Sequence, residues 1–158
     1  MQIRNLRLKR LLSVIAICAI FISCNEKKKD VSYSKKTKAI SKKKQLSPLE
    51  KSIKVGKTIY TDMCVVCHQA SGKGVPKAFP PLANSDYLKD NQTASIIGLK
   101  KGMKGEIIVN GETYNSYMAP LGLGNDEIAD VMNYINHSWG NNYGDLITEE
   151  EVTKLLEE

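Results

Sequence analysis

Side chains that build metal clusters and aromatic cores are scarce in this 158-residue sequence, which has two histidines, four cysteines, two phenylalanines and one tryptophan. Two histidines are too few for the ligand set of a copper enzyme. We also expect the protein to have no small-molecule substrate. Long apolar runs are also missing. The run from Leu11 to Ile22 is shorter than the about 20 residues that a membrane-spanning helix needs. The sequence therefore favours neither a copper enzyme nor a chain of membrane-spanning helices.

One local pattern carries chemistry: Cys64-Val65-Val66-Cys67-His68. Cys-x-x-Cys-His is the attachment signal of c-type haem. In such a site each thiol adds to a vinyl group of one porphyrin, and the histidine is held against the iron as its proximal ligand. The pattern predicts one covalent haem c bound through Cys64 and Cys67, with His68 on the iron. A porphyrin would also add apolar volume to a domain that has few aromatic residues.

Two other chemistries stay open for these residues. A thiol–disulfide oxidoreductase would use Cys64 and Cys67 directly, and it predicts a βαβ context with the pair at the start of a helix. A haem catalyst or gas sensor would have a displaceable ligand, or none, on the second axial position. A zinc site needs further ligands that the pattern does not supply.

The first 24 residues have the layout of an export signal. Four basic residues at positions 4–10 precede the apolar run, which ends in Phe21-Ile22-Ser23-Cys24. These segments are typical of a signal peptide, and the last four residues resemble a bacterial lipobox. We expect residues 1–24 to be a lipoprotein signal peptide, with Cys24 lipid-modified as the mature N-terminus. The protein would be exported and anchored to a bacterial membrane, with its domain facing the periplasm; exposure at the cell surface is the alternative. An ordinary secretory signal or an uncleaved anchor is the alternative.

Residues 25–46 contain nine lysines, opposed by Glu26 and Asp30, and few apolar side chains. A segment of that composition buries too little surface to fold, so we expect a flexible tether whose lysines lie near anionic lipid. Nucleic acid is not an expected partner for a segment between a lipid anchor and a domain. Residues 47–158 have a net charge of −5, and their acidic side chains are concentrated in an extension at 141–158.

Capping residues predict the start of the folded domain. Ser47, Pro48 and Glu50 fit an N-cap, a first helical position and a capping box. We expect that helix to reach about residue 64, and an irregular segment rich in glycine and proline over 69–85.

Four further elements are expected downstream. They are a short helix around 93–101, a hairpin with an Asn-Gly turn over 107–114, a long helix capped by Asn125, and a short helix from Thr148. The long helix has apolar residues at helical spacing that should form its buried stripe: Ile128, Val131, Met132, Ile135 and Trp139.

Residues 47 to about 140 resemble class I monohaem cytochrome c. Gly56 and Tyr60 lie eight and four residues before Cys64, as in the N-terminal helix of that family. The face of its C-terminal helix is matched by Val131, Tyr134 and Ile135. The resemblance implies an all-α fold in which the two terminal helices cross over a covalent haem, with a small residue at the crossing. It also implies a small β-hairpin before the loop that holds the axial methionine.

The resemblance also implies the remaining contacts to the haem. Phe79-Pro80-Pro81-Leu82 matches the segment whose proline carbonyl accepts a hydrogen bond from the proximal imidazole, which makes Pro80 that acceptor and Leu82 a haem contact. Met118 stands where the family places its axial methionine, a soft and neutral donor. Because methionines usually fill cores, packing is the alternative role for Met118.

Four other side chains compete for the second axial position. Met63 adjoins the attachment motif, Met103 is expected in a turn, and Met132 belongs to the buried stripe. His137 lies opposite Ile128 on a helix of 3.6 residues per turn and is therefore expected at the surface.

A haem with both axial positions filled predicts a one-electron carrier and not an enzyme. The hairpin, the Met-Ala-Pro run and the segment 138–141 resemble cytochrome c domains found beside copper nitrite reductases and quinoprotein alcohol dehydrogenases. We expect a monomer whose partner is a redox protein, either one of these enzymes or a terminal oxidase, and which docks through a small transient interface.

Overall fold

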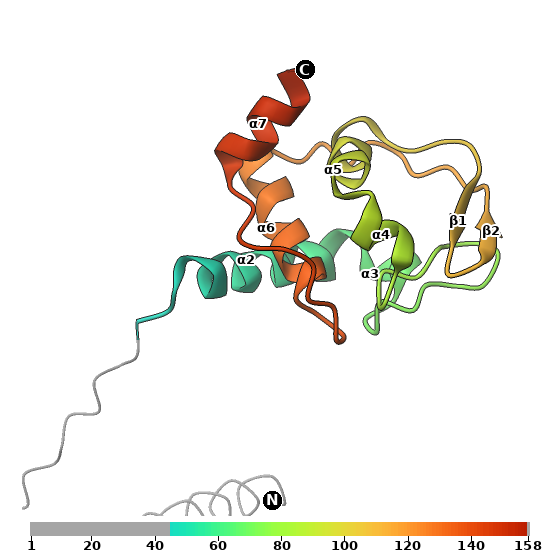
Figure 1. The fold of residues 1–158 in the computed structure, drawn as a ribbon, viewed down its shortest axis with the longest axis horizontal. Helices are drawn as coiled ribbons and strands as arrows, with labels where there is room; N and C mark the ends of the chain where they lie inside the picture. Colours follow the sequence, from blue (N-terminus) through green and yellow to red (C-terminus); the bar gives the residue numbers. More distant parts are fainter. Residues whose placement is uncertain (1–44, 158) are drawn as a thin grey trace, which may run out of the picture. The chain divides into compact units, whose positions relative to one another are not determined.

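The computed structural model describes residues 45–157 (Figure 1). The predicted signal peptide, Cys24 and residues 25–44 of the predicted tether lie outside the described residues. Helices dominate the described part, and its sheet is a single antiparallel hairpin. In chain order the elements are α2 (Pro48–Met63), α3 (Val65–His68), α4 (Asp86–Asp90), α5 (Gln92–Lys101), β1 (Ile107–Val109), β2 (Glu112–Tyr114), α6 (Asn125–Asn136) and α7 (Glu149–Glu157).

Helix α2 begins where its capping residues predict. The Ser47 hydroxyl accepts a hydrogen bond from the Glu50 backbone N–H at 3.2 Å, and the Glu50 carboxylate accepts one from the Ser47 N–H at 2.7 Å. These two bonds satisfy N–H groups that have no partner inside the helix. The helix ends at Met63, one residue before the predicted end, and Cys64 is its C-cap.

Helices α2 and α6 cross each other (Figure 1), and Gly56 lies at the crossing, as the resemblance implies. A Cβ atom at position 56 would lie 1.9 Å from the Asp130 carbonyl oxygen and 2.9 Å from Tyr134 Cβ. No residue larger than glycine fits between the two backbones. The crossing therefore explains why α2 keeps a glycine in its interior, where it costs about 1 kcal/mol relative to alanine.

The start of α6 corrects one prediction. Gly124, not Asn125, is the N-cap, and its N–H donates to the Glu127 carboxylate at 2.8 Å. Asn125 begins the helix, and its side chain joins three elements instead. Its Oδ1 accepts from Lys100 Nζ of α5 at 3.0 Å, and its Nδ2 donates to Thr153 Oγ1 of α7 at 2.9 Å. The prediction was wrong because a tertiary contact took the side chain that could have capped the helix.

The prediction that Trp139 belongs to the buried stripe of this helix was also wrong. The predicted stripe of α6 is buried at Ile128, Val131, Met132 and Ile135, but the helix ends at Asn136. Trp139 lies beyond it with φ of 53°. Its indole N–H donates to the Ala70 carbonyl at 3.0 Å. Its ring centroid lies 5.0 Å from that of Tyr60 and 5.5 Å from that of Tyr134.

Helix α7 covers the domain rather than extending from it. Thr148 and Glu151 form the predicted capping box, and Val152 is fully buried against its neighbours. The fully buried Asn133 of α6 holds the preceding segment, because its side chain both donates to and accepts from the Ile147 backbone at 2.8 Å. The acidic extension is thus part of the folded unit.

The hairpin forms as predicted, with positive φ at Asn110 and Gly111 in its turn. It is pinned to α4, since Asp86 and Asn110 each accept a hydrogen bond from the other's backbone N–H, at 2.7 and 3.0 Å. Helix α4 was not predicted. None of the described helices has the length and apolar character to cross a membrane.

Candidate functional site

A cavity of about 400 Å³ opens beside the α2–α6 crossing, within the size range of small-molecule and cofactor sites. Its walls are mainly apolar and come from both long helices, α5, the hairpin and the loops around residues 80 and 118. All the predicted haem contacts of residues 45–157 line this one cavity, although they come from three separate stretches of sequence: Cys64, Cys67, His68, Pro80, Leu82 and Met118.

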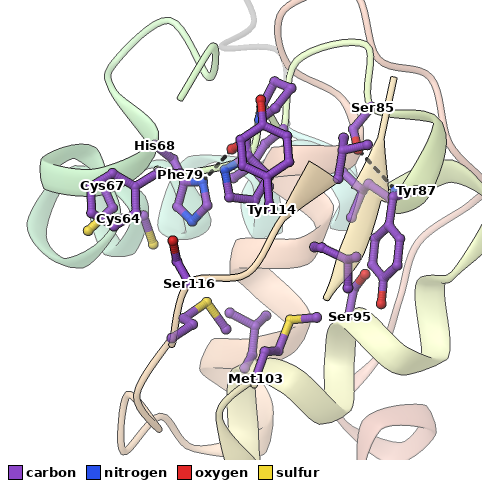
Figure 2. Close-up of a pocket in the computed structure, with 18 of the residues that line it drawn as sticks. Cys64, Cys67, His68, Phe79, Ser85, Tyr87, Ser95, Met103, Tyr114 and Ser116 are labelled. Atoms are coloured by element: carbon purple, nitrogen blue, oxygen red, sulfur yellow. Dashed lines mark hydrogen bonds between the residues drawn. The ribbon is translucent and has the colours of Figure 1, made fainter. Parts of the chain in front are cut away.

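The attachment motif turns one face toward the cavity. The one-turn helix α3 places positions 64, 67 and 68 together, because residues three and four apart share a helix face. Cys64 is buried, whereas Val66 on the opposite face is 87% exposed. Figure 2 shows both cysteines beside His68 at one end of the cavity.

His68 is oriented for a metal. Its Nδ1 lies 3.0 Å from the Pro80 carbonyl oxygen, and because a carbonyl can only accept, Nδ1 carries the proton. The lone pair is then on Nε2, and Figure 2 shows that nitrogen on the side of the ring toward Ser116 and Met103. Burial lowers the pKa of His68, and the bond to Pro80 opposes this only in part. The imidazole is therefore neutral at pH 7 and can ligate a metal.

The two motif cysteines form no disulfide and line the cavity together with the histidine. Burial, with the nearby Cys67 as the smaller cause, raises the pKa of the free Cys64 thiol to about 11. An unattached Cys64 therefore holds its proton more tightly than an exposed thiol does. Cys64 and Cys67 would supply the two sulfurs that bond the vinyl groups of the haem.

The loop that carries Pro80 is held by backbone hydrogen bonds within residues 68–82 and by a side chain from the C-terminal extension. The Gly74 N–H donates to the His68 carbonyl at 3.0 Å, and the Leu82 N–H donates to the Gly72 carbonyl at 2.7 Å. From the C-terminal extension, Asn141 donates to the Leu82 carbonyl at 2.9 Å and accepts from the Asn84 N–H at 2.7 Å. Asn141 has no local sequence signal for this role, because its partners lie almost 60 positions away.

Met118 lies in the loop between β2 and α6 and lines the cavity together with Met63, Met103 and Met132. All three competing methionines thus reach the same space. Met103 was expected in a turn, but its backbone pairs with that of Met118. His137 is absent from the cavity lining, and its Nδ1 donates to the Asn133 carbonyl at 2.9 Å.

The donor set of the cavity fits a haem: a neutral imidazole, two thiols at one end and thioether sulfurs within an apolar wall. Among residues 45–157, no group of three or more His, Cys, Asp or Glu side chains is placed to hold a bare metal ion. The sheet of this part is an antiparallel hairpin, whereas the oxidoreductase alternative predicts a βαβ unit.

Comparison with known proteins agrees with this site. The family model of cytochrome c matches residues 53–139. Cytochrome c-552 of Thermus thermophilus is 40% identical over 90 residues, which cover 54% of this chain and 68% of that protein. The chain covers 60% of a second cytochrome c-552, from another strain of the same species, at the same identity.

More distant relatives belong to a larger enzyme. The cytochrome c subunit of the quinone alcohol dehydrogenase of Gluconacetobacter polyoxogenes is 33% identical over 104 residues, which cover 63% of this chain but 22% of that subunit. The helix-rich fold with its small hairpin agrees with the class I cytochrome fold. The chain belongs to the cytochrome c family, and it is an electron-transfer protein with a covalently bound haem c, not an enzyme.

Proposed function

We propose that this protein is a membrane-tethered one-electron carrier whose single haem is attached through Cys64 and Cys67 and ligated by His68 and Met118. The observation that carries the proposal is the convergence of these four side chains, from separate stretches of sequence, on one apolar cavity. When bound, the haem supplies an iron that cycles between Fe(III) and Fe(II).

The residues around the cavity hold that group in one geometry. The Pro80 carbonyl fixes the His68 tautomer and makes the imidazole a better donor. Bonds from Cys64 and Cys67 and donors from His68 and Met118 would leave the haem ligands little freedom to rearrange, which would keep the reorganisation on electron transfer small. The apolar walls, among them Leu82 and Leu99, exclude water from the site.

Met118→Ala tests the axial assignment. We expect the oxidised protein to lose its weak long-wavelength sulfur-to-iron absorption, because the substitution removes the proposed axial thioether. The reduction potential should fall by on the order of 0.2 V, since a methionine ligand raises it. Visible spectroscopy and a redox titration of the haem-loaded protein measure both changes.

Met63→Ala is the matched control, since Met63 lines the same cavity but is 41% exposed beside the attachment motif. It should keep the absorption and the potential. Persistence of the absorption in Met118→Ala would show that another group ligates the iron.

The membrane part of the proposal rests on sequence outside the described residues. Lipid on Cys24 and the lysines of residues 25–46 provide the two signals that stable anchoring needs. As a flexible chain, this tether would span about 26 Å. It would keep the domain close to partners at a periplasmic membrane face and raise their effective concentration.

Cys24→Ala is expected to move the protein from the membrane fraction to the soluble fraction of its host, because it removes the acylated residue. Fractionation followed by detection of the covalent haem measures the shift. Cys18→Ala is the control and should leave the protein on the membrane. Membrane retention of the Cys24 variant would mean that the apolar run anchors the chain by itself.

A redox enzyme is the proposed partner. Relatives of this chain are cytochrome c subunits of quinone alcohol dehydrogenases, which supports a quinoprotein dehydrogenase as electron donor. A copper nitrite reductase or a terminal oxidase would serve as the acceptor. Stopped-flow mixing of the carrier with each purified enzyme, followed at the haem absorption, identifies which of them exchanges electrons with it.

A further inference from the structure

Met103 and Met118 are joined by their backbones. The Met103 N–H donates to the Met118 carbonyl at 2.8 Å, and the Met118 N–H donates to the Met103 carbonyl at 2.9 Å. Residues that exchange both bonds in an antiparallel pair carry their side chains on the same face. Both side chains line the haem cavity, so the pairing presents two thioethers side by side.

The Met103 side chain packs against Gly98 of α5, and this contact forms its seat. A Cβ atom on Gly98 would lie 2.5 Å from Met103 Cγ and 2.6 Å from its Sδ. The thioether therefore occupies space that exists only because residue 98 has no side chain. This part of α5 is packed into the core, since the neighbouring Ile96 and Leu99 are 3% and 7% exposed. Figure 2 shows the Met103 side chain on the far side of the cavity from the cysteines.

The residue before Met103 also lies against the Met118 loop. Gly102 has φ of +79°, and a Cβ there would lie 2.7 Å from the Met118 carbonyl oxygen and 2.9 Å from Pro120 Cδ. The segment 102–103 thus follows the Met118 backbone closely. In the described part of the chain, residues 115–123 make no backbone–backbone hydrogen bond other than the two to Met103. Tyr117, next to Met118, is 67% exposed.

We propose that Met103 is a positioning residue for Met118: seated against Gly98 of α5, it transmits the rigidity of that helix to the loop that presents the axial sulfur. This rests on the proposed function, in which Met118 ligates the iron. Met118 lies in a loop without helix or strand and is partly buried against the core. Lys100 of α5 holds the end of that loop at the Leu123 carbonyl, whereas Met103 bonds the backbone of Met118 itself. The seat of Met103 then sets how readily the axial sulfur leaves.

Exchange of the axial ligand measures this role. Imidazole is added to the oxidised, haem-loaded protein, and the rate at which it replaces Met118 is followed by loss of the sulfur-to-iron absorption. We expect Met103→Ala to raise that rate about tenfold, because it removes the seat. Gly98→Ala should raise it by a similar factor, because its methyl group displaces the Met103 side chain. The reduction potential should fall in both.

The double variant Gly98→Ala with Met103→Ala separates a shared mechanism from two independent ones. If both changes act through the same seat, the double variant exchanges no faster than either single variant. Independent effects would multiply to about a hundredfold, and that result would overturn the proposal.

Met132→Ala is the matched control. Met132 lines the same cavity and is more deeply buried, at 1% exposure, but it lies on α6 and has no backbone bond to Met118. Its truncation should lower the unfolding temperature and leave the exchange rate within about twofold. An exchange rate unchanged by Met103→Ala, or raised as much by Met132→Ala, would show that Met103 has no special link to the ligand.

Met103→Leu completes the set, because it keeps the volume without the sulfur and should fold even if the alanine variant does not. The absorption and a near-normal exchange rate should both persist. Loss of the absorption would instead make Met103 the ligand and overturn the proposal. Failure of the proposed function looks different: the unmodified protein would lack the absorption, or Met118→Ala would leave it intact.

Discussion

Replacing Gly56 by alanine is expected to lower the free energy of unfolding by about 3 kcal/mol, a large share of the stability of a small domain. The added methyl group would lie 1.9 Å from the Asp130 carbonyl oxygen and 2.5 Å from its carbon. Both are backbone atoms of α6, which cannot rotate away. The two helices must therefore separate by roughly 1 Å before the methyl fits.

The opposing effect is smaller. Alanine favours a helix interior over glycine by about 1 kcal/mol, but separation of α2 from α6 loosens the largest interface of the described fold. Tyr60 and Val131, both essentially buried, would lose contacts on either side of the crossing. Chemical denaturation of the haem-loaded protein measures the change, and the unfolding temperature should fall by about 10–20 °C.

Two comparisons isolate the cause. Thr58→Ala on the exposed face of α2 should change stability by less than about 0.5 kcal/mol. Gly98→Ala meets the flexible side chain of Met103 rather than backbone, so it should cost less stability than Gly56→Ala. A Gly56→Ala variant as stable as the original protein would show that the helices separate easily and that glycine is not needed at the crossing.

The crossing also links stability to the site. Cys64 and His68 follow directly from the end of α2, whereas Met132 and Ile135 reach the same cavity from α6. A shift between the helices therefore widens the haem cavity and weakens contacts on both sides of it. We expect variants at position 56 to change the haem spectrum as well as the unfolding temperature.

Elements with local signals were predictable from the sequence. The capping boxes at Ser47 and Thr148 and the Asn-Gly turn at residues 110–111 each depend on side chains within four positions of one another, and each forms as expected. The attachment motif is equally local, because one helical turn brings its two cysteines and its histidine to one face.

Features that depend on distant contacts were missed or misjudged. Asn125 is drawn away from capping by Lys100 and Thr153, and Trp139 leaves the helix to bond with Ala70. Helix α4 has five residues, too few for a periodic pattern, although the Ser85 side chain that caps it was a readable signal.

In the candidate site, too, local signals were predictable from the sequence and distant contacts were not. The motif identifies one side of the haem from sequence spacing alone, and the family resemblance supplied Pro80 and Met118. Neither could reveal the support of Met118, because Met103 is fifteen positions away and its seat on Gly98 exists only in the folded chain. A methionine beside a glycine-rich turn carries no sequence signal for that role.

Replacing both Cys64 and Cys67 by alanine is expected to abolish covalent attachment of the haem. In the unmodified protein, acidified organic solvent should extract essentially no haem, because each thiol has added to a vinyl group and the bond survives denaturation. In the double variant the extraction should be complete. His68 stays in place and can still ligate the iron, so bound colour before denaturation does not contradict the prediction.

The single variants show whether each cysteine forms its own bond. Cys64→Ala and Cys67→Ala should each keep the haem on the denatured chain, with its absorption shifted to longer wavelength because one vinyl group stays conjugated with the porphyrin. An unshifted spectrum in either would mean that the replaced sulfur forms no bond.

Alkylation of the two cysteines tests the thiol–disulfide alternative. Alkylating reagents should leave both residues of the haem-loaded protein unmodified, whereas a dithiol oxidoreductase would react at both after reduction. Modification of Cys64 or Cys67 in that protein, or retention of haem by the denatured double variant, would show that attachment does not occur through this pair.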